Sequence, residues 1–378
     1  MRRRIWVAAL LPALLLAGCR STALPYGREI EHMALMRTMG VDSAQDGVTV
    51  TVSSQAQDGG RDQGSQPPVV LSQSSGTISG ALLAMQADGA SYVFYGHVGQ
   101  LLLGETLARQ SVRPALDYVL RDIEMRLDTS LYLVQGEAGP AVSAPAMAGA
   151  EDGKAPSSAA EQLEAMEADA QLRSYATPRT VGEVLSELEE RGASYAPALA
   201  LTDEKEGTLM AAGYGILKDG VLQEWTDDEQ AHGINLLEGQ VNADVVELSM
   251  SSGEKVALRV VGATTRVTPV MNGEVLTGLR IVCDVEANLA EGPARLGPSK
   301  ADTLTALEEA LAQVEAARIR GALSLAQALD ADYLGLEKRA GLAAPWHWDA
   351  IQRGWDMAQM DMDLTVQAHI ERGYDMDQ

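Results

Sequence analysis

Apolar and polar positions follow two different periods along the N-terminal half of the chain. Apolar residues at helical spacing predict helices over residues 77–87, 97–110, 113–121 and 180–191. Alternating or short aromatic runs predict strands over residues 47–53, 91–96 and 129–135. The polar stretch 55–73 contains a Gly-Gly and a Pro-Pro pair, which predicts a long loop. This alternation of elements indicates a mixed sheet with helices packed on one face.

The C-terminal half is richer in strands, and several of them are long. Strand patterns cover residues 198–201, 208–217, 221–225, 243–250, 255–270, 275–287 and 362–370, with turns at 218–220, 252–253 and 272–273. A capping box at Thr226–Glu229 opens a helix that ends near Gly239. A long helix is predicted over residues 299–327, and its buried stripe consists of Leu304, Leu307, Leu311, Val314 and Ile319. Two shorter helical segments follow around Trp346 and Trp355.

These patterns predict an α+β protein of several domains, each a mixed or antiparallel sheet with packed helices. The predicted divisions are a signal peptide (1–18), an N-terminal domain (19–197), a small middle domain (198–240) and a C-terminal domain (241–378). Residues 136–170 are dominated by alanine, glycine, serine, proline and glutamate. That composition predicts a mobile low-complexity segment within the N-terminal domain.

The start of the chain has the features of a bacterial lipoprotein precursor. Three arginines at positions 2–4 precede an uncharged, mostly apolar stretch over residues 5–17, which is too short to span a bilayer as a helix. The stretch ends in Leu16-Ala17-Gly18-Cys19, the lipobox pattern in which small residues precede the acylated cysteine. The alternative is an ordinary signal peptide that happens to end in a cysteine. We therefore expect Cys19 to carry the lipid and residues 20–28 to tether the fold to the membrane.

Composition narrows the classes of partner. The formal net charge is −24, and loss of the three signal arginines makes the remaining chain more acidic still. A nucleic-acid partner is excluded because phosphate groups require a basic surface. Adhesion to anionic lipid by charge alone is disfavoured for the same reason. Cys283 lies in an apolar strand pattern, so we expect a buried thiol without a disulfide partner.

Patterns of known catalytic and cofactor sites are incomplete. The glycines at 292 and 297 have the spacing of a phosphate loop, but Pro298 stands where a lysine is required. Ser252 and Lys255 have the spacing of an acyl-transfer motif, but the pattern there predicts a turn. The five histidines are scattered, which argues against a zinc site. We therefore expect no cofactor, no metal and no catalytic residue.

Two clusters of side chains are candidates for recognition. His97, Leu101, Glu105 and Arg109 follow one another at four-residue intervals, which predicts a single helical face with a Glu105–Arg109 ion pair. That face serves either as a structural ion pair or as a ridge for docking a partner. The aromatic cluster of Trp346, Trp348 and Trp355 belongs either to the core or to a recognition surface.

Several blocks of the sequence, taken in order, resemble one known family. The blocks are residues 92–109 (YVFYGHVGQLLLGETLAR), 117–126 (DYVLRDIEMR), 213–222 (GYGILKDGVL) and 233–239 (GINLLEG). With the lipobox and the closing strand, which ends at Arg372-Gly373, they are similar to the Ger(x)C family. Its members are the lipoprotein C subunits of nutrient germinant receptors in endospore-forming bacteria. The chain departs from the family at Arg20-Ser21, where a Trp-Asp pair is usual, and in the enlarged segment 136–170.

The resemblance implies a three-domain mixed α/β protein without catalytic residues. It implies a position on the outer face of the spore inner membrane, in complex with the integral-membrane A and B subunits of the receptor. His97, Glu105, Arg109, Arg121 and Glu124 are then candidates for a shared framework that serves structure or partner docking. The sequence leaves open whether a small-molecule germinant contacts this subunit.

Two other functions compete with the receptor subunit. A lipid-anchored solute-binding protein of a transporter would have two similar lobes, and the long-strand pattern over residues 243–287 fits that arrangement poorly. An envelope hydrolase would need a nucleophile or a metal site that the motifs do not supply.

Overall fold

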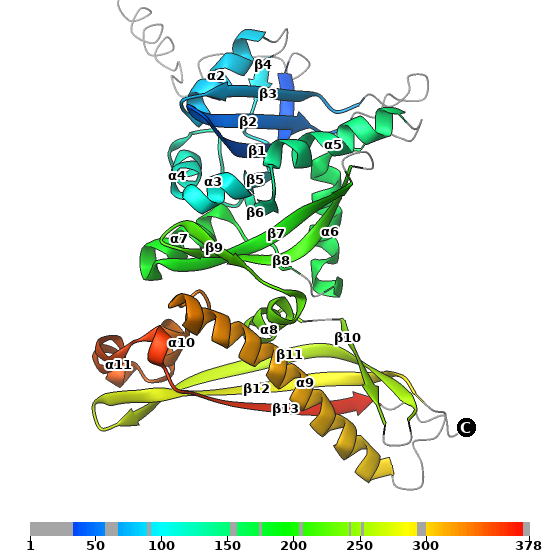
Figure 1. Cartoon of the computed structure of the whole chain (residues 1–378), viewed down its shortest axis with the longest axis vertical. Coiled ribbons are helices and arrows are strands. Elements are labelled where there is room, and N and C mark those ends of the chain that lie inside the picture. Colours follow the sequence, from blue (N-terminus) through cyan, green and yellow to red (C-terminus); the bar gives the residue numbers. More distant parts are fainter. Residues whose placement is uncertain are drawn as a thin grey trace, which may run out of the picture.

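The chain folds into two β-sheets with packed helices (Figure 1). The computed structural model describes residues 33–56, 67–88, 92–151, 157–173, 176–203, 207–241, 243–250, 253–292 and 300–372. The two sheets lie one after the other along the long axis of the molecule. The predicted class, α+β with mixed or antiparallel sheets and packed helices, is confirmed.

The first sheet has nine strands, eight of which follow the order β3-β2-β1-β5-β6-β7-β8-β9, while β4 pairs with β1. Their bounds are β1 Met33–Ala44, β2 Gly47–Ser54, β3 Val70–Ser75, β4 Tyr92–Phe94, β5 Gln100–Gly104, β6 Ser130–Gln135, β7 Ala193–Asp203, β8 Thr208–Lys218 and β9 Val221–Trp225. The pairs β1–β5, β5–β6 and β6–β7 are parallel, and antiparallel pairs flank this centre. The sheet is therefore mixed.

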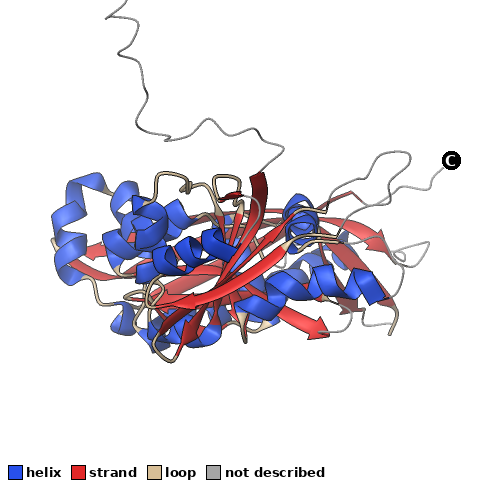
Figure 2. Ribbon diagram, turned by 90° about the horizontal axis from the view of Figure 1, so that it is seen from above, coloured by secondary structure: helices blue, strands red, loops and turns tan. Residues whose placement is uncertain are grey.

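Helices cover both faces of the first sheet. One face carries α2 (Ile78–Asp88), α3 (Glu105–Gln110), α4 (Arg113–Arg121) and α7 (Val181–Arg191). The other face carries α5 (Ala138–Glu151) and α6 (Ala159–Arg173). Seen along the long axis, helices lie on both sides of the strands (Figure 2).

The helix predicted over residues 97–110 is wrong in its first half. Leu101, Leu102 and Leu103 form β5, and the helix α3 begins only at Glu105. Leu101 and Leu103 face one helical layer of the sheet, and Leu102 faces the other. A parallel strand that is covered on both faces has a continuous apolar run, which periodicity cannot separate from a buried helix.

The segment 136–170 is not the predicted loop, because α5 and α6 occupy most of it. Ala138, Ala141 and Val142 are fully buried against the sheet. A Cβ atom at Gly40 on β1 would lie 3.0 Å from Val142 Cγ2, so glycine permits the close approach of α5. Small residues that indicate disorder in isolation here allow close packing of helix on sheet.

Two smaller predictions are also corrected. β3 occupies part of the stretch predicted as a loop up to residue 73. The capping box of α8 lies one residue further on, where Asp227 caps the helix and Gln230 bonds back to it. The shift leaves Thr226 free to accept a hydrogen bond of 2.9 Å from the N–H of Tyr214.

The second sheet has the order β10-β11-β12-β13 and carries one long helix. Its elements are β10 Asp244–Ser249, β11 Lys255–Asn272, β12 Val275–Glu291, α9 Lys300–Leu329, α10 Leu336–Ala343, η2 Pro345–His347, α11 Trp348–Gly354, η3 Met357–Gln359 and β13 Met362–Arg372. β13 pairs in parallel with β12, whereas the hairpin partners are antiparallel. Leu307, Leu311 and Ile319 of the predicted stripe are buried on α9, while Leu304 and Val314 are half-buried.

The short helix α8 (Asp228–Glu238) follows the first sheet in the sequence and packs on α9. Residues 198–240, predicted as a middle domain, therefore divide between strands of the first sheet and a helix next to the second. The predicted limit between residues 197 and 198 falls inside β7.

Cys283 is fully buried in the core of the second sheet and has a free thiol, as predicted. The aromatic cluster is divided. Trp355 packs against the core, whereas Trp346 is 77% exposed.

Candidate functional site

Of the predicted framework residues, the structure brings Glu105 and Arg109 together. Their side chains form an ion pair of 2.8 Å on α3. Glu105 also accepts a hydrogen bond of 3.3 Å from the indole N–H of Trp225, and Arg109 donates one of 3.2 Å to the carbonyl of Gln223. The pair therefore links α3 to β9, and the predicted ion pair is confirmed.

The other framework residues are spread over separate places. His97 lies in a turn, where it packs edge to face with Phe94 and lines a pocket of about 350 Å³. Arg121 lines a different pocket of about 560 Å³. Glu124 accepts hydrogen bonds of 3.4 Å from the Tyr92 hydroxyl and from the N–H of Tyr95. The single face predicted from His97 to Arg109 does not exist, and Cys19 lies outside the described residues.

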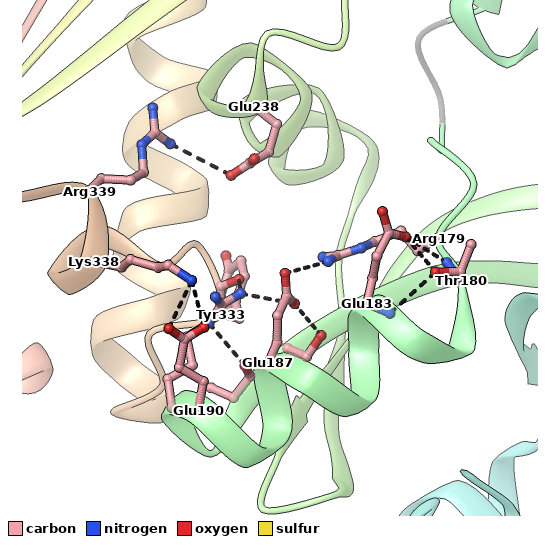
Figure 3. Close-up of polar contacts among 12 residues, drawn as sticks. Arg179, Thr180, Glu183, Glu187, Glu190, Glu238, Tyr333, Lys338 and Arg339 are labelled. Atoms are coloured by element: carbon pink, nitrogen blue, oxygen red, sulfur yellow. Dashed lines mark hydrogen bonds and ion pairs between the residues drawn. The ribbon is translucent and has the colours of Figure 1, made fainter. Parts of the chain in front are cut away.

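A set of charged and aromatic side chains lies where the first sheet meets α8 and α10 (Figure 3). We call it the junction network. It consists of Arg179, Glu187, Glu190, Arg191, Glu238, Lys338 and Arg339, with the tyrosines Tyr195, Tyr214 and Tyr333. These residues come from α7 and the segment just before it, from β7, β8 and α8, and from the segment around α10.

Glu187 on α7 is the centre of this network. One carboxylate oxygen lies 2.5 Å from Arg179, and the other lies 2.9 Å from Arg191. The hydroxyl of Ser194 donates a further bond of 2.6 Å. A capping box between Thr180 and Glu183 sets the first turn of α7 and so fixes the position of the helix.

Aromatic rings form the inner wall of the junction network. The Arg179 guanidinium lies 4.1 Å from the centre of the Tyr195 ring, a cation–π contact. Tyr195 packs edge to face against Tyr214 of β8 and against Tyr333, which precedes α10. Burial raises the pKa of the Tyr195 hydroxyl well above its ordinary value, although the nearby Arg179 opposes the shift. Tyr195 therefore stays neutral in the physiological range.

Five contacts continue the network into the second half of the chain. Arg191 donates a bond of 3.1 Å to the carbonyl of Tyr333, and Lys338 pairs with Glu190 at 2.8 Å. Arg339 lies 3.6 Å from Glu238 and donates to the carbonyls of Leu237 and Thr265. Burial raises the pKa of Glu238, and Arg339 opposes that rise. The junction network thus fixes the two sheets relative to each other.

Glu187→Gln should test whether this network stabilises the fold. The amide keeps the size of the side chain but leaves Arg179 and Arg191, 10% and 13% exposed, without the charge that compensates them. We expect the free energy of unfolding in urea to fall by about 2 kcal/mol. Glu190→Gln is the matched control, because Glu190 lies on the same helix and its ion pair with Lys338 is about half exposed. Equal stability of both variants would contradict the role of Glu187.

A second buried network joins α8, α9 and β10. The Arg318 guanidinium lies 2.9 Å from Glu229, 2.5 Å from Asp244 and 3.3 Å from Glu315. His232 lies 3.6 Å from Asp244. We call these five residues the Arg318 network. The sequence contains a sign of this buried charge. Glu315 follows Leu311 by four residues, so it lies on the same inward face of α9.

The Arg318 network predicts a pH-dependent stability. Burial raises the pKa of Glu315 from 4.5 to about 7, although Arg318 opposes the shift. Between about pH 4.5 and pH 7, the folded protein therefore binds more protons than the unfolded chain. The stabilisation from protonated Glu315 is complete below about pH 4.5 and is lost as the pH rises through about 7.

We expect Glu315→Gln to remove this dependence. Between pH 4.5 and 7.5, the free energy of unfolding of the variant should fall by roughly 2 kcal/mol less than that of the parent protein. Urea titrations at a series of pH values measure the difference. Glu309→Gln, an exposed position on the same helix, should follow the parent curve. Parallel curves for the parent and Glu315→Gln would show that Glu315 does not titrate in this range.

Neither network has the arrangement of a catalytic centre. Their buried carboxylates are bound by arginines, which favours structural ion pairs over proton transfer. Among the described residues, no group of three or more metal-ligating side chains could hold an ion. No helix in the described part of the chain is both long enough and apolar enough to cross a membrane.

Comparisons with known proteins agree with this architecture. The chain is 23% identical over 389 residues to the putative spore germination protein YfkR of Bacillus subtilis strain 168, which covers 97% of this chain and 95% of that protein. The crystal structure of the GerBC protein superposes with a TM-score of 0.58 at 15% identity, over 88% of this chain and 97% of that one. That likeness confirms the fold.

Two family descriptions match adjoining parts of the chain. The spore germination protein N-terminal domain matches residues 27–201. The spore germination B3/GerAC-like C-terminal domain matches residues 212–374. Because these two domains match in this order over most of its length, the chain belongs to the GerAC-like family of spore germination proteins.

Proposed function

We propose that this chain is the lipid-anchored C subunit of a spore nutrient germinant receptor. It acts in receptor assembly and germination signalling and catalyses no reaction. The observation that carries the proposal is the match of both GerAC-like domains, in order, downstream of a lipobox. Acylated Cys19 holds the chain on the outer face of the spore inner membrane, next to the integral-membrane A and B subunits.

The geometry supports a role in transmitting or holding a conformation. The junction network and the Arg318 network use their charged groups to join elements that are distant in the sequence. A rigid connection between the two sheets would allow a partner bound on one sheet to constrain the other. The His97–Arg109 and Arg121–Glu124 segments act in this proposal as the framework of the N-terminal half.

The experiment is a pull-down from detergent-solubilised spore inner membrane with the full-length tagged protein. We expect two polytopic germinant-receptor subunits to be recovered by mass spectrometry, and to be lost when Cys19→Ala releases the chain from the membrane. Ser21→Ala changes a neighbouring residue without removing the acylation site and is the matched control. Recovery of a transporter permease would favour a solute-binding protein, and recovery of no membrane partner would overturn the receptor assignment.

A further inference from the structure

Large apolar side chains are exposed where the chain enters the first sheet. Leu83, Leu120 and Ile123 are 72%, 50% and 82% exposed. They account for three of the ten large hydrophobic residues that are exposed in the described part of the chain. We call these three residues the entry surface. Exposed apolar side chains that gather in one region indicate an interaction site.

Hydrogen bonds hold both segments of the entry surface against β4. Gln86, which follows Leu83 by three residues on α2, bonds in both directions with the backbone of Val93. Glu124, which follows Ile123, accepts a bond from the Tyr92 hydroxyl. Tyr92 in turn pairs with Met33, the first described residue of β1. The entry surface therefore lies close to the point at which the chain enters the fold.

This region is at the end of the molecule that is furthest from the second sheet. Figure 1 shows α2 and β4 at one end of the long axis and the second sheet at the other. Cys19 precedes Met33 by 14 residues in the sequence. At about 3.3–3.6 Å per residue, a chain of that length spans at most about 50 Å. An acyl group on Cys19 would hold this end of the fold near the bilayer.

We propose that the entry surface inserts its apolar side chains into the outer region of the bilayer to which Cys19 is anchored. The inference rests on the proposed acylation of Cys19. The second sheet then points away from the membrane, and the short tether and the entry surface together fix the orientation of the subunit.

The chemistry of the entry surface favours lipid over a protein partner. Its three large side chains are aliphatic, whereas energetic centres of protein interfaces are enriched in tryptophan, tyrosine and arginine. The charges beside them are mixed, because Arg121 and Arg126 alternate with Asp122, Glu124 and Asp128. Since the whole chain is strongly acidic, attraction to anionic lipid cannot supply the binding. Insertion should therefore be insensitive to salt and should occur on zwitterionic lipid.

The test uses the acylated full-length protein in phosphatidylcholine vesicles. Ile123→Cys supplies a thiol for a fluorescent label, since the native Cys283 is fully buried and Cys19 is acylated. Leu342→Cys is the matched control, because Leu342 is 66% exposed and lies on α10 beside the second sheet. Lipids with brominated acyl chains quench a label in the bilayer, and iodide quenches a label in water.

We expect the label at position 123 to be quenched by brominated lipid about fivefold more than the label at position 342, and to be protected from iodide. High salt should leave that difference unchanged. Adding Leu83→Ser should reduce the protection at position 123 without affecting the control position. Leu83 is exposed, so this change should leave the fold intact.

Three results would count against the inference, and they can be told apart. Failure of the protein to sediment with vesicles would overturn the anchoring of Cys19 together with the insertion that depends on it. Sedimentation with equal quenching at both positions would preserve the anchor and overturn the insertion. Protection of position 123 that appears only after A and B subunits are added would assign the entry surface to a protein partner.

Discussion

Arg318→Met is expected to lower the free energy of unfolding by about 3–5 kcal/mol, the typical cost of removing one partner from a buried ion pair. Arg318 is 9% exposed, and its guanidinium compensates Glu315, which is fully buried, and Asp244. Methionine fills a similar volume but leaves both carboxylates without that partner. Urea unfolding followed by tryptophan fluorescence measures the effect, because Trp355 packs against the core of the same half.

The control for this prediction is Arg280→Met on β12, in the same half of the chain. Arg280 is 61% exposed at its side chain and lies 3.5 Å from Asp363, which is equally exposed. Exposed ion pairs contribute at most about 1 kcal/mol. A loss no larger than that of the control would show that Arg318 does not stabilise the buried carboxylates.

Gly233→Ala is expected to destabilise the protein by about 2–3 kcal/mol, within the range measured for overpacked cores. Gly233 lies on α8, where a Cβ atom would come within 2.2 Å of the carbonyl oxygen of Arg318. The clash is with the backbone of α9, so no side-chain rotation can relieve it. The two helices would have to separate, which would also lengthen the contacts of the Arg318 network.

Gly321→Ala provides a close control for the glycine change. Gly321 lies on α9, and a Cβ atom there would meet only Gln230 Cγ at 3.5 Å, an ordinary contact. Alanine is favoured over glycine by up to about 1 kcal/mol inside a helix, so this variant should equal or exceed the parent in thermal stability. If Gly233→Ala proved as stable as Gly321→Ala, α8 and α9 could not be packed backbone to backbone at that point.

These two predictions concern the same contact for different reasons. α8 follows the last strand of the first sheet and packs through Gly233 on the long helix of the second. The junction network holds the opposite side of α8 through Glu238 and Arg339. α8 is therefore one element through which a change at one sheet would reach the other, as the proposed signalling role requires.

The elements with strong periodicity were predictable, although the capping box of α8 begins one residue later than predicted. α7 begins at a Thr-x-x-Glu capping box and ends before Gly192, which adopts φ 69°. β11 and β12 are joined by a turn in which Gly273 has φ 63°. These caps and turns are formed by interactions between residues close in sequence, so a short segment is enough to predict them.

The predictions for β5 and α5 were wrong because the same residue types indicate a different structure when the segment is packed against neighbouring elements. Leu101–Leu103 are all apolar because helices cover both faces of β5, so side chains that point to either face are buried. The alanines of α5 suggested a mobile segment, yet they are the residues that let a helix approach Gly40 closely. Neither feature can be recognised without knowing which element lies opposite.

The polar contacts also divide into those that the sequence predicts and those that only the tertiary structure shows. The Glu105–Arg109 pair was predictable because both residues lie on one helix. Arg318 with Asp244, and Arg191 with the carbonyl of Tyr333, join residues that are far apart in the chain, so no local pattern indicates them. The lipobox at Cys19, the acidic charge and the order of the family blocks were contained in the sequence alone. The packing of α8 on α9 and the burial of charges beside it were decided only by the tertiary structure, because the energy of a buried charge depends on the partners that folding brings to it.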